Sequence, residues 1–371
     1  MPAVPLPHAD VDIVGALDFE RTMWGVVPRR LPAWTRRQAP KDMEWQISSA
    51  SGVRIRFATR ATRVQLTLRG GRHPGAVRVP SLVSLLVNGE PDGDAELRRA
   101  VPLTDDFLAS GQNNDETLVF DDLAPVLKTL ELWLPNTCVV ELRRLAASAP
   151  IERAEPDQRP SWWHYGSSIS QATGAYGPLG TWVAAAAFGA DVRLTSLGFG
   201  GQAMLDPFVA RTIRDSDADL ISCCLGINIH NRDTMRARTF APAVHGFLDT
   251  IREGHPTTPL LVISPIAFPA GEDCPGPLVF DDKGIAHPVG DPAAIADGAL
   301  SVGRIREILA EVLAARGNDE NLCFLDGRDL LGMTESTLLV DGLHPTPAGY
   351  DAIARRFVPR AQALGFFPAH A

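Results

Sequence analysis

Four short segments in the second half of the chain contain the residue types that attack on an ester requires. In chain order they are Gly166-Ser167-Ser168-Ile169, Gly198-Phe199-Gly200-Gly201, Gly226-Ile227-Asn228 and Asp341-Gly342-Leu343-His344. Each comes just after an apolar run, where a loop at the end of a buried strand is expected. Any one of them is a weak signal, because short patterns arise by chance. Their joint occurrence in this order predicts a single site for nucleophilic acyl chemistry.

Ser168 is the predicted nucleophile and His344 the predicted base. A serine hydroxyl is a poor nucleophile unless a base takes its proton during the attack, and histidine suits that task because its pKa lies near neutral pH. Of the nine histidines, only His344 has a carboxylate three residues earlier, at Asp341. That carboxylate could accept the N–H of Nδ1 and leave Nε2 facing Ser168. The sequence therefore predicts a catalytic triad.

Three amides could stabilise the negative charge that develops on the carbonyl oxygen of an ester. The predicted donors are the backbone N–H groups of Ser168 and Gly201 and the side-chain amide of Asn228. Such donors must stand where the charge forms. The glycines of the 198–201 segment let the backbone turn sharply without a side chain that would block the acyl group. Together these groups form the predicted oxyanion hole.

Each of these patterns also has a simpler structural explanation. The glycines of 198–201 could only turn a strand into a helix, and Asn228 could only form a turn. Asp341 and His344 could cap the helix that follows them. These explanations would have to hold at four loops at once and in the required order. The catalytic interpretation is preferred for that reason.

Four neighbouring features are expected to be mainly structural. His164 is expected as a packed core histidine rather than a second base. Trp162-Trp163 are expected in the core, with a pocket wall as the alternative. Asp206 is expected to cap a helix, with a substrate contact as the alternative. His230-Asn231 could either contact substrate or only shape the loop.

The bulk composition is that of an ordinary globular protein, with 45% hydrophobic and 21% charged residues in a chain of 371. This length favours two domains over one. The formal net charge is −9 and the arginine pairs are scattered. Phosphate binding needs concentrated positive charge, so no nucleic-acid partner is expected.

Neither a membrane segment nor a metal or cofactor site is predicted. Residues 1–10 lack the cationic start and long apolar run of a signal peptide, and the richest apolar stretch, residues 182–190, is far shorter than a bilayer span. The five cysteines lack metal-ligand spacing, which indicates reduced thiols and predicts a cytoplasmic protein. No glycine-rich loop for a phosphate is present.

Residues 1–150 are predicted to form a β-sandwich of jelly-roll type, because short alternating strands are punctuated by Gly, Asn and Asp. The turn Asn88-Gly89 is expected to follow the strand 82–87. The predicted strands are 53–57, 64–68, 82–87, 116–120, 129–134 and 138–142. Residues 146–160 are polar and contain three prolines, so they are expected to be a linker.

Residues 151–371 are predicted to form a second domain, an α/β domain with a parallel sheet of five strands covered on both faces. The predicted strands are 162–165, 192–197, 219–225, 260–264 and 322–325, and the predicted helices are 179–188, 207–214, 241–252, 299–315 and 347–364. Thr346 and Pro347 are expected to start the last helix as N-cap and first residue. A flavodoxin-like strand order, 2-1-3-4-5, would bring the loops of Ser168, Gly201 and Asn228 to one crevice.

The stretch Gly271 to Asp291 interrupts the alternation of strands and helices. Residues 278–280 and 285–287 are predicted to form a small hairpin inserted after the fourth strand. Such an insert could border the active cleft. It could equally be a surface decoration without substrate contact.

The four segments resemble the serine, glycine, asparagine and histidine blocks of the SGNH/GDSL acylhydrolase superfamily. The run 164–171, His-Tyr-Gly-Ser-Ser-Ile-Ser-Gln, is similar to the Gly-Thr-Ser-Ile-Thr-Gln variant of its serine block, whose bacterial members carry an N-terminal β-sandwich. The resemblance implies Ser168, Gly201, Asn228 and His344 as the block residues, with Asp341 as the acid. Ser167 departs from it, because the name-giving motif has aspartate there, and that aspartate is mainly structural.

Three functions fit the sequence. The first is a serine esterase that deacylates a small-molecule or carbohydrate ester, an acetylated sugar among them, through an acyl-enzyme on Ser168. The second is an acyltransferase that uses the same site. The third is a carbohydrate-binding protein with a degenerate site. Association into a homo-oligomer is left open by the sequence.

Overall fold

The computed structural model describes residues 1–72, 79–104, 107 and 114–368. The chain forms two compact units. Unit 1 consists of Met1–Gln158 and Ala175–Ala184, and unit 2 of Arg159–Gly174 and Ala185–Ala371. The domain division at residues 150 and 151 stays a prediction, since compactness alone does not tell whether either part folds by itself.

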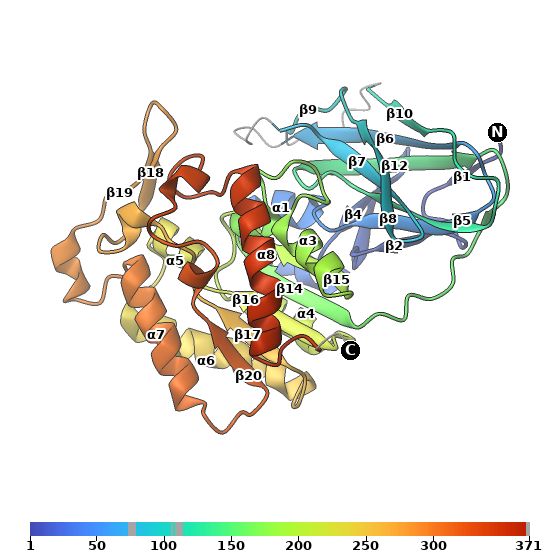
Figure 1. The fold of residues 1–371 in the computed structure, drawn as a ribbon. Helices are drawn as coiled ribbons and strands as arrows, with labels where there is room; N and C mark the ends of the chain where they lie inside the picture. Colours follow the sequence, from blue (N-terminus) through green and yellow to red (C-terminus); the bar gives the residue numbers. More distant parts are fainter. Residues whose placement is uncertain (73–78, 105–106, 108–113, 369–371) are drawn as a thin grey trace. The chain divides into compact units, whose positions relative to one another are not determined.

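Unit 1 is built from two β-sheets (Figure 1). Among the described residues the larger sheet has seven strands, in the order β10-β6-β12-β4-β3 with β1 beside β12 and β9 beside β6. These strands are β1 Ala3–Pro5, β3 Asp18–Arg21, β4 Val26–Arg29, β6 Val64–Arg72, β9 Val101–Pro102, β10 Glu116–Phe120 and β12 Cys138–Ala147. All of its pairs are antiparallel except β6 with β9.

The smaller sheet has six strands among the described residues, in the order β13-β5-β11-β7-β8 with β2 beside β5. These strands are β2 Asp12–Val14, β5 Arg54–Thr59, β7 Leu82–Val87, β8 Glu90–Glu96, β11 Lys128–Trp133 and β13 Ile151–Glu152. Between β4 and β5 lie the short helices η1 Ala33–Arg37, η2 Lys41–Met43 and α1 Glu44–Ser48.

Alternate side chains of the two sheets meet in one hydrophobic core. They include Leu66, Leu68 and Val140 from the larger sheet and Ile55, Phe57 and Leu130 from the smaller one. This alternation is the one that the strand patterns of the sequence predicted, and two antiparallel sheets packed face to face are a β-sandwich. The jelly-roll connection of its strands stays a prediction.

The strand predictions for this half are confirmed, and two features differ. Asn88 and Gly89 turn between β7 and β8 with φ of 50° and 87°, as the Asn-Gly pair predicts. Strands β1 to β4, β9 and β13 were not predicted, because two to four residues are too few for an alternating pattern, and β8 was not predicted because its seven residues are mostly polar. The predicted linker of residues 146–160 is wrong at its start, since β12 continues to Ala147 and Ile151–Glu152 pairs with β5.

Unit 2 contains a parallel sheet of five strands in the order β15-β14-β16-β17-β20. Numbered along the chain this order is 2-1-3-4-5, so the flavodoxin-like prediction is confirmed. The strands are β14 Ser161–Gly166, β15 Arg193–Gly198, β16 Leu220–Cys224, β17 Leu260–Ile263 and β20 Leu322–Leu325. All the predicted strands of this half match these to within one or two residues at each end.

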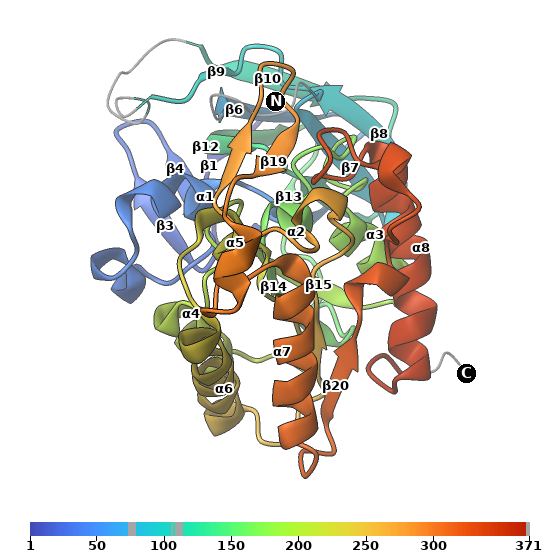
Figure 2. The ribbon, with the colours of Figure 1, turned by 90° about the vertical axis from the view of Figure 1, so that its left-hand side faces the viewer.

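Helices cover both faces of this sheet (Figures 1 and 2). Tyr165 of β14 stacks on Phe247 of α6, whereas Trp162 of the same strand stacks on Phe357 of α8. Side chains at odd and even positions of a strand point to opposite faces, so α6 and α8 lie on opposite sides. The helices are α2 Ser168–Gln171, α3 Trp182–Gly189, α4 Pro207–Arg214, α5 Ile227–Arg232, α6 Ala237–Gly254, α7 Val302–Ala315 and α8 Pro347–Ala363.

Most helix predictions are confirmed, with differences at the N-terminal ends. The Thr346 side chain caps α8 by accepting the N–H of Gly349, as predicted. Helix α7 begins at Val302 rather than Ala299, because Ser301 is its N-cap. Helix α6 begins four residues earlier than predicted, and Pro242 lies inside it as its sixth residue.

The predicted hairpin insert after β17 is confirmed as the pair β18 Leu278–Phe280 and β19 Ala286–Pro288. The 3₁₀ turns η3 Pro269–Gly271 and η4 Pro292–Ile295 bracket it, and η5 Gly327–Asp329 and η6 Ser336–Leu338 follow β20. No helix of the described residues is long and apolar enough to cross a membrane.

Candidate active site

The nucleophile segment joins β14 to the short helix α2. Ser167 takes the N-cap position, and its hydroxyl accepts the N–H of Ile169 at 3.2 Å. Ser168 is therefore the first residue of the helix, where a backbone N–H has no partner within the helix. No hydrogen bond from this N–H to another described residue is found. The Ser168 amide is thus free to bind an oxyanion.

The hydroxyl of Ser168 meets the imidazole of His344. Ser168 Oγ lies 2.8 Å from His344 Nε2, and His344 Nδ1 lies 2.7 Å from Asp341 Oδ2. An ionised carboxylate can only accept, so Nδ1 carries the proton and Nε2 is left to accept the Ser168 hydroxyl. The structure brings together the three side chains that the sequence singled out.

The Asp341–His344 turn is held by the carboxylate itself. Asp341 Oδ1 accepts the backbone N–H groups of Leu343 at 2.9 Å and His344 at 2.7 Å. Gly342 adopts a φ of 83°, which permits this tight return. Burial opposes ionisation of the Asp341 carboxyl, but the hydrogen bonds from His344 and from the two backbone amides outweigh it and lower its pKa. The acid is therefore ionised at neutral pH and can stabilise a protonated His344.

The two remaining oxyanion candidates follow the strands on either side of β14. Asn228 is the second residue of α5, after β16, and its Oδ1 accepts the N–H of Ala203 at 3.0 Å. This bond fixes the amide so that its Nδ2 donor is directed elsewhere. Gly201 follows β15 with a φ of 68°, and no hydrogen bond from its N–H to another described residue is found. Both groups lie beyond the C-terminal edge of the sheet, where Ser168 lies.

Three contacts connect these loops to the nucleophile helix. Gln171 Oε1 accepts the N–H of Gly200 at 2.8 Å, and the N–H of Phe199 binds the carbonyl of Gly166 at 2.7 Å. A Cβ on Gly198 would lie 2.5 Å from the backbone nitrogen of Gln171, so only glycine allows α2 to pack this closely. Gln171 was not singled out by the sequence analysis. The sequence signal that could have identified Gln171 is its side-chain amide at the end of the serine block, residues 164–171.

His164 is buried and serves the core, as predicted. Its Nδ1 and Nε2 each lie 2.7 Å from a hydroxyl, of Ser222 and Ser170 respectively. Burial lowers the pKa of the ring to about 3, which keeps it neutral at any ordinary pH. The two tryptophans beside it, Trp162 and Trp163, are also buried, which confirms their core interpretation. With both ring nitrogens held by hydroxyls in the core, His164 has no nitrogen left to face Ser168.

Asp206 starts helix α4 in a different way from the prediction. It occupies the N-cap position, but its side chain makes no capping hydrogen bond to the helix. Its Oδ2 atom is buried and has no hydrogen-bond partner among the described residues. Burial accordingly raises the pKa of the carboxyl to about 6.

His230 is fully buried on α5, two residues beyond Asn228. Its ring bonds to Asn231 and to the backbone of Cys274 rather than facing the Ser168 hydroxyl. This favours the loop interpretation of His230-Asn231 over direct substrate contact. Groups of three or more His, Cys, Asp or Glu side chains that could hold a metal ion are not found in the described part of the chain.

The segment that contains these residues matches a known protein family. The GDSL-like Lipase/Acylhydrolase family matches residues 164–352, just over half of the chain. This chain belongs to that family. The match begins at His164, four residues before Ser168, and ends within α8, beyond His344. The resemblance that the sequence blocks carried is thereby confirmed for this GDSL-like protein.

Solved structures share the fold of the GDSL-like protein over its whole length. The salicylyl-acyltransferase SsfX3 from a tetracycline biosynthetic pathway is 28% identical, with a TM-score of 0.83 over 100% of this chain and 99% of that one. An acetyl xylan esterase, Est2A, from the rumen bacterium Butyrivibrio proteoclasticus is 12% identical, with a TM-score of 0.57 over 99% of this chain and 100% of that one.

A family two carbohydrate esterase from Clostridium thermocellum, solved with cellohexaose, is 15% identical, with a TM-score of 0.58 over 86% of this chain and 94% of that one. At such identities, the two carbohydrate esterases show likeness of fold alone. Comparison with curated proteins gives no match.

Proposed function

We propose that this GDSL-like protein is a serine esterase that cleaves small-acyl esters through an acyl-enzyme on Ser168. The observation that carries the proposal is the continuous chain of hydrogen bonds from Ser168 Oγ through His344 to Asp341, at 2.8 and 2.7 Å. Serine, histidine and acid in this relation are what acyl transfer through a covalent intermediate requires.

In the first half-reaction, Ser168 Oγ attacks the ester carbonyl while His344 Nε2 takes the hydroxyl proton. The imidazolium that results is stabilised by the ionised Asp341 beside Nδ1. The negative carbonyl oxygen receives hydrogen bonds from the Ser168 and Gly201 amides and from the Asn228 side chain. The tetrahedral intermediate collapses, the ester C–O bond breaks, and His344 gives its proton to the departing alcohol.

In the second half-reaction, water attacks the acyl-enzyme while His344 takes one of its protons. The Ser168–acyl bond breaks, the carboxylic acid leaves, and the proton returns from His344 to Ser168 Oγ. The net reaction is hydrolysis of the ester to an alcohol and a carboxylic acid. The enzyme is regenerated without a cofactor.

The substrate class that we propose is an acetyl or other short-chain ester on a carbohydrate or small metabolite. Its support is the fold shared over nearly the full length with an acetyl xylan esterase and a carbohydrate esterase. Screening hydrolysis across acyl lengths and acetylated sugars tests it. A preference for long acyl chains with no turnover of acetyl esters would contradict the substrate class while leaving the serine mechanism untouched.

The mechanism is tested by the variant Ser168→Ala with p-nitrophenyl acetate as substrate. Loss of at least about 10³-fold in kcat is expected, because no hydroxyl remains to form the acyl-enzyme. Thermal unfolding of the variant checks that it is folded. Undiminished turnover by folded Ser168→Ala would remove this residue from the mechanism.

A second candidate function, acyl transfer to an acceptor other than water, is favoured by one comparison. The salicylyl-acyltransferase is 28% identical over the full length of this chain, well above the carbohydrate esterases. Water and an acceptor alcohol or amine would attack the same acyl-enzyme, so only product analysis separates the two functions. Acylated acceptor as the main product, at high acceptor concentration, would establish transfer. Carboxylic acid as the only product would exclude it for that acceptor.

The third candidate, a carbohydrate-binding protein with a degenerate site, has no observation in its favour. All three side chains of the proposed triad are present and in contact. A fluorophosphonate probe, which labels activated serines, separates it from the other two. Absence of labelling on the native protein would favour it.

A further inference from the structure

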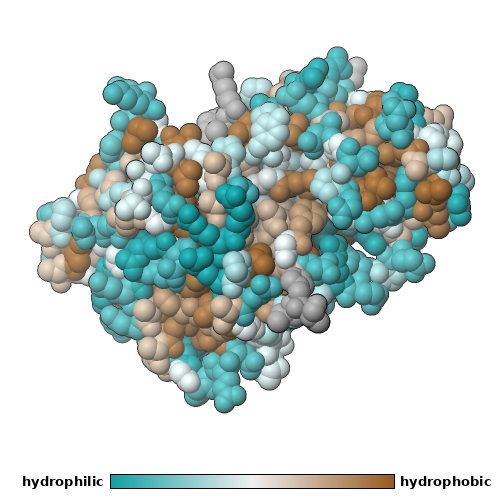
Figure 3. Space-filling model, in the orientation of Figure 1, coloured by the Kyte–Doolittle hydropathy of each residue, from teal (hydrophilic) through white to brown (hydrophobic). Residues whose placement is uncertain are grey.

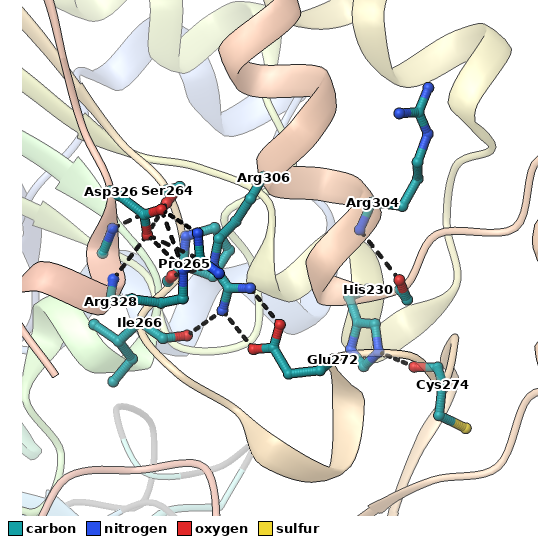
Figure 4. Close-up of polar contacts among 12 residues, drawn as sticks. His230, Ser264, Pro265, Ile266, Glu272, Cys274, Arg304, Arg306, Asp326 and Arg328 are labelled. Carbon is teal, nitrogen blue, oxygen red and sulfur yellow. Dashed lines mark hydrogen bonds and ion pairs between the residues drawn. The ribbon is translucent and has the colours of Figure 1, made fainter. Parts of the chain in front are cut away.

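The hairpin insert, residues 271–291, is anchored at its base by a buried charged pair. Glu272 accepts two hydrogen bonds from the guanidinium of Arg306 on α7, at 2.5 and 2.7 Å. The same guanidinium also donates to the carbonyls of Pro265 and Ile266, both at 3.0 Å (Figure 4). Arg306 is almost fully buried, so these bonds form in a low dielectric, where charge-assisted bonds are strong. The base of the insert is therefore rigidly placed.

The next contact of the insert is with α5, the helix that carries Asn228. His230 Nε2 lies 3.0 Å from the carbonyl oxygen of Cys274 (Figure 4). A carbonyl can only accept, so Nε2 carries a proton and donates it. The ring of His230 also meets Phe268 edge-on, with centroids 5.8 Å apart. A Cβ on Gly276 would lie 1.8 Å from the carbonyl oxygen of His230, so backbone lies directly against backbone.

The third contact of the insert is with the Asp341–His344 turn. The N–H of Ala286, in β19, donates to the carbonyl oxygen of Asp341 at 2.8 Å. Leu343, which lies between Asp341 and His344, is buried in a small core beside Ala286. The stem of the hairpin therefore supports the turn in two ways. It binds the backbone of the turn at Asp341, and it shares a core with the apolar side chain of Leu343.

One core joins the two halves of the site. Its buried members are Ile227, Phe268, Ala286, Val302 and Leu343. Ile227 immediately precedes the oxyanion candidate Asn228, whereas Leu343 immediately precedes the base His344. Helix α5 has six residues, too few for a helix to be stable by itself, so its position depends on these contacts.

The tip of the hairpin takes no part in these contacts. Asp282 and Lys283 are exposed, and Figure 3 shows hydrophilic residues at the tip with hydrophobic ones in the stem below it. What the insert does for the site must therefore come from its stem and from residues 272–276.

We propose that the hairpin insert, acting through His230, is a positioning element that sets the base and the oxyanion amide relative to each other, an inference that rests on the proposed function. His230 is a positioning residue here, because it acts through α5 and the insert and touches no reacting atom. The Nε2–H bond to Cys274 holds the insert on α5, and the insert holds the turn of His344. Without that bond, α5 and the turn keep only their shared apolar core, whose contacts fix position less directionally than a hydrogen bond does.

The experiment compares His230→Phe, which keeps a ring but removes the donor, with His230→Gln, whose amide N–H can replace the donor. The measurements are kcat and KM for p-nitrophenyl acetate, the rate constant for labelling of Ser168 by a fluorophosphonate, and the fraction of molecules that label. We expect His230→Phe to lower kcat per labelled site and the labelling rate roughly tenfold to a hundredfold, with KM within about twofold, because a misplacement of about 1 Å costs on that scale. His230→Gln should recover most of the loss.

His255→Phe is the matched control. His255 is also buried, and its Nε2 also lies within hydrogen-bond distance of a backbone carbonyl, that of Ile213 at 2.9 Å. It precedes β17, at the edge of the sheet opposite the candidate site. This variant should lower the melting temperature while leaving kcat per labelled site unchanged.

The outcomes separate this inference from the proposed function. If wild-type protein neither labels nor hydrolyses esters, the proposed function fails. If wild-type protein labels and His230→Phe shows the same kcat per labelled site, with only a lower labelled fraction or melting temperature, His230 is merely structural and the positioning inference is overturned. Should His230→Phe not fold, His230→Met, which keeps bulk but also removes the donor, takes its place: a loss of kcat per labelled site with KM unchanged supports the inference, and kcat per labelled site within about threefold of wild type overturns it.

Discussion

At the residue scale, the two carboxylate oxygens of Asp341 have different hydrogen-bond partners. Oδ1 accepts two backbone N–H groups of its own turn, whereas Oδ2 accepts the Nδ1–H of His344. The bonds that fix the turn therefore also keep the carboxyl ionised, and the ionised carboxyl selects the tautomer in which Nε2 faces Ser168. Three residues of sequence spacing are enough to build the base and its support together.

The Asn228 side chain uses its oxygen for a hydrogen bond within the protein, which leaves its Nδ2 donor for an oxyanion. Because Oδ1 is taken by the N–H of Ala203, the Nδ2 group is the part that can bind an oxyanion. We expect Asn228→Ala to lower kcat by roughly 10²–10³, with a much smaller change in KM, as for removal of one oxyanion donor. Steady-state hydrolysis of p-nitrophenyl acetate measures both. An Asn228→Ala variant that turns over at the wild-type rate would exclude this amide from the oxyanion hole.

Asp206 predicts a pH-dependent gain of stability on substitution. Burial raises the pKa of its carboxyl to about 6 from an ordinary 3.8, so the folded state holds this proton more tightly than the unfolded chain. Ionisation therefore destabilises the protein progressively as pH rises from about 4 to above 6. Asp206→Asn, which carries no charge, should be more stable than wild type by about 1–2 kcal/mol at pH 8 and no more stable at pH 4.

Urea denaturation at the two pH values measures this difference. Asp215, at the other end of α4, provides the control, because it is exposed and its pKa is lowered by hydrogen bonding to Arg214. Asp215→Asn should give no gain at pH 8. Equal effects of Asp206→Asn at pH 4 and pH 8 would contradict the burial argument.

At the scale of elements, helix α2 shows how the chain replaces the aspartate of the family motif. Ser167 stands at that position and its hydroxyl caps the helix through the N–H of Ile169. Serine and aspartate are both good N-cap residues, because either side chain supplies an acceptor to the first turn. The departure from the motif therefore keeps the local support of the nucleophile.

If the Ser167 hydroxyl caps α2, two substitutions at this position should differ in their effect on stability. Ser167→Ala should lower the free energy of unfolding by about 1 kcal/mol, whereas Ser167→Asp should keep it near the wild-type value. Thermal or urea unfolding of the two variants measures the difference. If alanine and aspartate were equally destabilising, the cap would not be what the Ser167 side chain contributes.

Several elements that the sequence could not predict are very short. Helices α2 and α5 have four and six residues, less than two turns, so neither shows a periodic apolar face. Their residues were nevertheless identified, because glycine, serine and asparagine mark the ends of the preceding strands. By contrast, helix α8 and strand β20 were predicted nearly to the residue, since caps and apolar runs are local signals.

The contacts that support the site could not be predicted at all. The bond between Gln171 and Gly200 joins residues 29 apart, and that between Ala286 and Asp341 joins an insert to a distant turn. Neither leaves a periodic trace in the sequence, because both depend on how loops meet at the edge of the sheet. The triad itself was predictable because Asp341 and His344 are close in the chain and the family blocks are distinctive.

At the scale of the whole molecule, one chain combines a sandwich of two mainly antiparallel sheets and an α/β unit that holds every candidate catalytic group. Each unit has its own buried core, as the change of periodicity along the sequence predicted. Whether the parts fold separately, with a boundary at residue 150, can be measured by limited proteolysis followed by mass analysis. The cytoplasmic location likewise stays a prediction, and association into a homo-oligomer stays open.

The central claim is that Ser168 becomes covalently acylated. Intact-mass analysis after treatment with a fluorophosphonate, followed by peptide mapping, tests it most directly. One adduct per chain is expected, located on Ser168, and lost in both Ser168→Ala and protein unfolded before treatment. An adduct on another residue, or ester turnover that continues in protein fully labelled on Ser168, would contradict the account.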